Sequence, residues 1–122
     1  MNHTEWNELV QEVELHIIKL EQASLSVGEL FYDSIEPKTL EVFSQYLKGF
    51  YDISHAIAVT VENGESFIPS LKEKTEQHVN ELFNQFEQMK LLLNQERFVS
   101  LADIMKYEIP SHLQKILVVL KE

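Results

Sequence analysis

Apolar residues recur every three or four positions over most of the chain, which is the spacing of one face of an α-helix. No stretch alternates apolar and polar residues over the length of a strand. Three glycines and three prolines are also too few for the many turns of an all-β fold. The pattern therefore predicts an all-α protein with four apolar stripes, which we assign to four helices.

The first stripe predicts one long helix over about residues 4–33, with Thr4 as the N-cap. Gly28 lies inside this segment, and a break there is the alternative because glycine costs about 1 kcal/mol relative to alanine in a helix interior. The stripe comprises Trp6, Leu9, Val10, Val13, Ile17, Leu20, Ser24, Val27 and Phe31.

The second and third helices have start and stop signals. Pro37 suits the first position of a helix, and we expect the second helix to end at about Val61, before Asn63-Gly64. The sequence 70–73 reads as a capping box, Ser-Leu-Lys-Glu, and predicts the start of the third helix. Asn94-Gln95 ends it. The second stripe comprises Leu40, Phe43, Leu47, Phe50, Ser54, Ile57 and Val61.

The last helix is predicted to follow a second capping box at 100–103, with Phe98 and Val99 as an apolar staple before it. Pro110 lies inside this helix, where proline removes a backbone hydrogen bond and clashes with the preceding turn. We therefore expect a kink, or two helices that meet at 109–111 with Ser111 as a new cap.

Short connections between long helices favour antiparallel neighbours. The prediction is a single domain over residues 1–122, built as an up-down-up-down four-helix bundle with its last helix kinked or split at Pro110. A chain of this length buries roughly two thirds of its unfolded surface, so it needs no covalent staples.

The net charge of −10 makes nucleic acid and anionic membranes poor partners. Residues 4–34 hold seven acids and one base, a net charge of −6, so most of the excess lies on the first helix. This helix presents either a solvated face that keeps the protein soluble or a docking surface for a basic partner.

The chain has no cysteine, which excludes disulfides and thiolate chemistry and suits a cytoplasmic protein. Its start has no basic segment followed by an apolar core, so we predict no signal peptide. No apolar run approaches the ~20 residues that span a bilayer.

One histidine falls on each predicted helix, which raises the question of a metal site. Carboxylate-bridged di-iron bundles need Glu-x-x-His on two helices. Only Asp52-Ile53-Ser54-His55 approaches that motif, and His55 lies well off its apolar stripe. His16, His78 and His112 lie at stripe edges. We predict no metal, no cofactor and no catalytic residue, because Gly-rich phosphate loops and nucleophile elbows are also absent.

The second helix has an apolar arc of about half its circumference, more than one face against a bundle needs. Either it packs centrally against two neighbours, or its spare edge meets a second chain. Tyrosine suits such an edge because its ring is apolar and its hydroxyl can stay in water. The second explanation predicts a homodimer, with Tyr46, Phe50 and Tyr51 on the partner surface.

The segment 98–110 is the most distinctive in the chain: an aromatic residue and valine, then Leu-Ala-Asp, then Tyr-Glu-Ile-Pro. It resembles the closing segment of small acidic all-α proteins of Gram-positive bacteria, a group without assigned function, and the resemblance implies no active site. Tyr107 and Glu108 precede the proline, where carbonyl groups lose their partners. Water or another chain could satisfy those groups, so both residues join the predicted partner surface.

Together these patterns favour a non-enzymatic protein-interaction domain, such as a small adaptor, a regulator or a chaperone-like bundle, with a partner that carries basic groups. The alternative is a bundle that binds a small apolar ligand between its helices.

Overall fold

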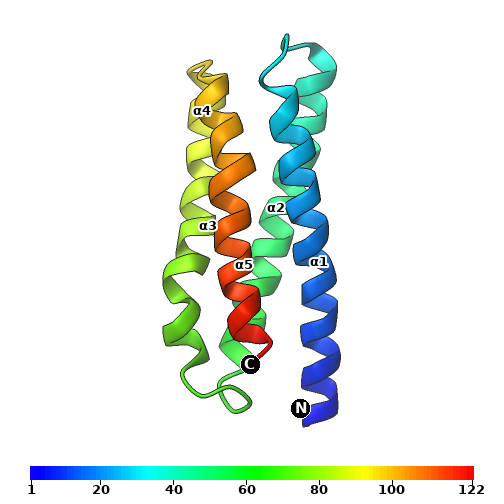
Figure 1. The fold of residues 1–122 in the computed structure, drawn as a ribbon, viewed down its shortest axis with the longest axis vertical. Coiled ribbons are helices and arrows are strands. Elements are labelled where there is room, and N and C mark those ends of the chain that lie inside the picture. The colour runs from blue at the N-terminus through cyan, green and yellow to red at the C-terminus, as the bar shows by residue number, and fades with distance from the viewer.

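The computed structural model describes residues 1–122 and contains helices and no strands (Figure 1). The predicted all-α class and the four helices are confirmed. Three of them are α1 (His3–Leu30), α2 (Pro37–Asn63) and α3 (Leu71–Asn94). The fourth, here called the C-terminal helix, joins α4 (Phe98–Asp103), the π-helical segment η1 (Ile104–Glu108) and α5 (Ile109–Leu120). α1 passes through Gly28 without a break.

The helices run alternately up and down, and both termini lie at the same end of the bundle (Figure 1). α2 packs against α1 and α3, and α5 packs against the same two helices. α1 and α3 are therefore diagonal partners, as are α2 and the C-terminal helix. Because α2 contacts two neighbours, its wide apolar arc is explained inside the bundle.

One cluster of 26 buried apolar residues fills the space between the helices. Phe31, Phe43 and Phe50 are among the largest fully buried side chains. The end of the bundle that holds the termini is closed by the α2–α3 loop, where the Phe67 ring stacks on Trp6 with 5.2 Å between ring centroids. No helix combines the length and the apolar content that crossing a bilayer requires.

The helix starts differ from the predicted caps, because residues outside the expected motifs take that role. Asn2, rather than Thr4, caps α1, in a capping box with Glu5. Ser70 precedes α3 but has φ 61° and makes no cap hydrogen bond. Instead, the Glu65 carboxylate accepts from the Lys72 backbone N–H at 3.1 Å. A loop side chain therefore satisfies a free donor of α3 that the sequence motif assigned to Ser70.

The C-terminal helix also begins earlier than expected. Phe98 and Val99 are its first helical residues, so they do not form a staple ahead of Ser100. Arg97 is the N-cap and supplies no side-chain hydrogen bond. The Phe98 ring stacks against Phe31 at 5.9 Å between centroids, and this tertiary contact draws the residue into the helix.

Pro110 does not split the C-terminal helix into two. Helical hydrogen bonding continues through it, and Ser111 does not cap a new helix. The preceding turns widen instead, and the Ile109 N–H donates to the Ile104 carbonyl, five residues back. A proline ring in a regular α-helix would clash with the carbonyl of residue 106. The π-helical turn η1 is where the chain accommodates that ring.

Candidate interaction surfaces

The structure divides the five residues of the predicted partner surface among three places. Tyr46 and Phe50 lie in the core, with 6% and 0% of their surface exposed, so they cannot form a surface of this chain. Tyr46 points inward because its hydroxyl is hydrogen-bonded to Ser24 Oγ at 2.7 Å across the bundle. Burial raises the pKa of Tyr46 and keeps its hydroxyl protonated.

Tyr51 is 46% exposed and lies on the α2–α3 face, whereas Tyr107 and Glu108 are exposed on the C-terminal helix. Because α2 and the C-terminal helix are diagonal in the bundle, the three residues do not form one surface. Glu108 borders a shallow polar groove with Arg97 and Asp103. The predicted patch is thus reduced to separate sites.

Tyr51 belongs to a group of aromatic rings, here called the Tyr51 cluster, with His55, Phe83 and Phe86. Its ring lies 5.4 Å from the Phe86 centroid and meets Phe83 edge-on at 6.4 Å. The His55 ring lies parallel to it at 6.2 Å. Lys90 Nζ lies 4.5 Å from the Phe86 centroid, a cation–π distance. These contacts hold the half-exposed Tyr51 ring in one orientation.

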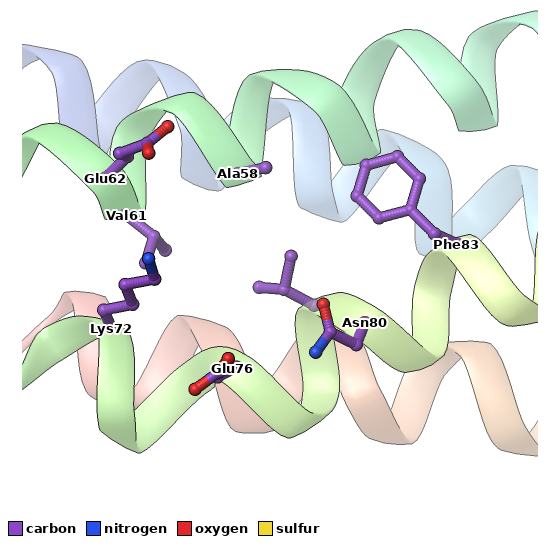
Figure 2. Close-up of a pocket in the computed structure, with 8 residues that line it drawn as sticks. Ala58, Val61, Glu62, Lys72, Glu76, Asn80 and Phe83 are labelled. Carbon is purple, nitrogen blue, oxygen red and sulfur yellow. The ribbon is translucent and has the colours of Figure 1, made fainter.

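A groove of about 300 Å³ continues from this cluster between α2 and α3 (Figure 2). Phe83 belongs to both features and marks one end of the groove. Ala58 and Val61 line it from α2, and Val79 lines it from α3. The floor of the groove is therefore apolar, and the ring cluster extends it.

The rim of the groove is charged. Glu62 from α2 and Glu76 from α3 flank the apolar floor, with Lys72 at the end away from Phe83 (Figure 2). Asn80 adds an amide beside Phe83. Two carboxylates against one ammonium leave a small negative excess, so a partner group entering here would gain from a positive charge.

A row of polar contacts, here called the ladder, joins α1 to the C-terminal helix. Its four pairs are Tyr32–Asp103, Glu29–Lys106, Glu21–Gln114 and Glu14–Lys121. From one pair to the next, the residue number falls on α1 and rises on the C-terminal helix by the same three, eight and seven residues. Antiparallel packing requires this correspondence. Three of the seven acids of the first helix thus have partners on the C-terminal helix, and its acidity is in part structural.

One part of the ladder joins α1 to η1. Lys106 Nζ lies 2.6 Å from the Glu29 carboxylate and 4.9 Å from the centroid of the Tyr32 ring. The hydrogen bond from Tyr32 to Asp103 raises the pKa of Tyr32 to about 12. Gly28 allows this approach, because a Cβ there would lie 3.0 Å from Lys106 Cγ and 3.1 Å from Met105 Cβ. The glycine that looked unfavourable in the helix is thus a packing requirement.

His78 and His112 form a pair that the sequence did not reveal. Their Nδ1 atoms lie 3.0 Å apart across the contact between α3 and α5. Burial, followed by the proximity of His78, lowers the pKa of His112. Each residue lies at the edge of its own stripe, and only the register between the two helices brings them together. No group of three or more metal-ligating side chains accompanies the pair.

A family model described as a domain of unknown function (DUF8042) matches residues 8–118. The chain therefore belongs to the DUF8042 family. Neither a curated protein nor a solved structure matches the chain. The predicted resemblance to an uncharacterised protein family is confirmed at this level.

Proposed function

We propose that this member of the DUF8042 family is a non-enzymatic protein-interaction domain, and that the Tyr51 cluster and the adjoining groove receive its partner. One observation carries the proposal: Tyr51 is 46% exposed and yet packed against neighbouring rings, among them Phe83 at one end of the groove. Rigid, half-exposed tyrosines on an apolar patch are typical anchors of protein interfaces.

The size and shape of the groove favour a protein partner over a free small molecule. Ligand sites are usually enclosed pockets of ~300–1,000 Å³ that surround most of the ligand. The groove, at about 300 Å³, lies at the low end of that range and is open along its length. It has room for an apolar side chain that projects from a partner, and the small molecule remains the alternative.

The charges of the rim indicate the partner's chemistry. Glu62 and Glu76 face one lysine, Lys72, and the whole chain carries −10. A partner that pairs an apolar anchor with a neighbouring Lys or Arg fits both the floor and the rim. We further propose, from the resemblance of residues 98–110, that the host is a Gram-positive bacterium and that the protein works in its cytoplasm.

The test is a photo-crosslinking amino acid placed at His55 in the native host, followed by binding of the identified partner to purified variants. We expect Tyr51→Ala to weaken the affinity by more than about tenfold, as truncation of an interface anchor does. Tyr107→Ala is the matched control, since it removes another tyrosine ring, which is 64% exposed on a different face of the bundle. We expect that variant to bind as the wild type does.

The opposite result would be a weakened affinity in Tyr107→Ala and an unchanged affinity in Tyr51→Ala. That result would contradict the proposal and favour a partner site on the C-terminal helix. A wild-type dimer in light scattering that Tyr51→Ala converts to a monomer would replace the basic partner by a second copy of the chain. A stoichiometric small molecule in native mass spectrometry that Tyr51→Ala and Phe83→Ala both release would support the ligand alternative instead.

A further inference from the structure

The outer face of α1 carries large apolar residues that no other helix covers. Leu15 is 62% exposed, Leu25 46% and Ile18 39%. The core residues of the same helix, among them Val13, Ile17 and Leu20, are nearly fully buried on its other side. α1 thus carries three large apolar residues, Leu15, Ile18 and Leu25, on the face that the bundle does not use.

The outer stripe has the spacing of a coiled-coil seam. Its positions alternate in steps of three and four, so that the same edge of the helix recurs every seven residues. The seam comprises Glu8, Gln11, Leu15, Ile18, Gln22, Leu25 and Glu29. Seams of this kind accept the apolar side chains of a second helix. Leu15, Ile18 and Leu25 form its apolar centre.

Acidic groups border this centre on both sides. In a coiled coil, the residues that flank the seam determine which helix can pair. Glu12 and Lys19 flank it on one edge, and Glu14 and Glu21 on the other. Glu8 and Glu29 add two carboxylates to its ends. Lys121 pairs with Glu14, Lys106 with Glu29 and Gln114 with Glu21, which leaves Glu8 and Glu12 without a partner on another helix.

We propose that the outer face of α1 docks an amphipathic helix of a partner protein, with leucine-like residues along one edge and Lys or Arg beside them. Charge complementarity selects this occupant. Residues 4–34 carry a net charge of −6, so a second copy of α1 would bring two acidic helices together. A basic helix gains from the same charges and covers the same apolar centre.

This surface is separate from the Tyr51 cluster, and the inference does not rest on the proposed function. Phe83 and Phe86 of that cluster belong to α3, which is diagonal to α1 in the bundle. The two surfaces can therefore be tested with different variants of one protein.

The experiment uses two synthetic peptides of about three heptads, both with leucine at the seam positions and with either lysine or glutamate beside them. Their binding to the full chain is measured by fluorescence anisotropy at low and at high salt. We expect the lysine peptide to bind and to weaken as salt rises, and the glutamate peptide not to bind.

The decisive variant is Leu15→Ser together with Leu25→Ser, which we expect to lower the affinity for the lysine peptide more than about tenfold. Leu15 is 62% exposed and Leu25 46%, and neither belongs to the core, so circular dichroism should show an unchanged fold. Leu91→Ser is the matched control, because Leu91 is 54% exposed on α3. We expect Leu91→Ser and Tyr51→Ala to bind the peptide as the wild type does.

Equal binding of the lysine peptide by the double variant would overturn the inference, since attraction to any acidic surface would then explain it. Binding of the glutamate peptide would overturn it as well. A wild-type dimer that the double variant converts to a monomer would show that a second copy, and not a basic helix, covers this face.

Discussion

Two helix contacts of the bundle differ in how close the helices come. Around Gly28, where α1 meets η1, the glycine lets the two helices approach closely. Nearer the termini, a pocket of about 270 Å³ lies between α1 and α5. Where α2 meets α3, the rings of Phe83 and Phe86 occupy the contact and a groove of about 300 Å³ stays open. A glycine thus permits a close contact around residue 28, and aromatic residues leave a groove open between α2 and α3. Stability and binding should therefore respond to different substitutions.

The largest effect is expected at the close contact around Gly28. Gly28→Leu would drive a side chain into Met105 and Lys106, where a Cβ alone would already lie 3.0–3.1 Å from the nearest side-chain carbons. Overpacking of this kind costs about 1–3 kcal/mol and occasionally more, and we expect the upper part of that range. Chemical denaturation measures the change. Gly49→Ala in α2 is the control, because nothing lies within 4 Å of its Cβ, and it should stabilise by about 1 kcal/mol.

The open contact should tolerate truncation better. Phe83 is only partly buried beside an existing groove, so Phe83→Ala should cost less than the ~3–5 kcal/mol of a fully buried phenylalanine. Phe31→Ala, at a ring that is 2% exposed, is the comparison. If Phe83→Ala destabilises the fold as much as Phe31→Ala, the α2–α3 face is structural and the contrast between the two contacts fails.

The other contact of α5, against α3, should depend on pH. Burial and His78 lower the pKa of His112 below its ordinary value of 6.5, so the unfolded chain binds more protons there. Lys115 acts in the same direction, while Glu81 and Glu108 oppose it. This contribution to stability is complete above pH 6.5 and is lost as pH falls below it.

Urea denaturation at pH 7.5 and pH 5.5 measures this dependence, with His112→Gln as the control. We expect the wild type to lose more stability over this interval than the variant does. Equal losses in both proteins would mean that other groups cause the pH dependence.

The smallest effect is expected at the end of the ladder. Lys121 Nζ lies 2.9 Å from the Glu14 carboxylate, but the lysine is more than half exposed. Exposed ion pairs contribute roughly 0.2–1 kcal/mol, so Lys121→Met should lower stability by no more than that. Because salt screens such pairs, the difference from the wild type should vanish at about 1 M salt. A difference that persists at high salt would mean that the ladder acts through packing.

The sequence predicted the helices well because their apolar periodicity is a property of each segment alone. It predicted the residue environments less well, because these depend on how segments meet. Tyr46 lies at the edge of its stripe, and only Ser24 on another helix shows why it points inward. Leu40 fits the stripe spacing but is 43% exposed. The His78–His112 pair requires the register between two helices, which no single segment contains.

The helix starts show the same limit at shorter range. Ser70 matches a capping motif, but Glu65 reaches the same helix from the loop and makes the motif unnecessary. Only part of the Tyr51 cluster could be predicted from the sequence, which identified Tyr51 as a surface residue. Phe83 and Phe86 come from another helix, and only the packing of α2 against α3 places their rings beside Tyr51.

The π-helical segment η1 sets how the residues after it are rotated about the axis of the C-terminal helix. A π-helical turn holds more residues than an α-helical one, so it changes the angle at which every later side chain leaves the helix. Leu113, Ile116 and Leu120 follow η1. All three are buried in the structure, where the π-helical turn holds one residue more than an α-helical turn. Regular α-helical winding of the same residues, with none removed, would turn these three by up to about 100° away from the core. The segment next to Pro110 thus sets the rotational alignment of everything that follows it.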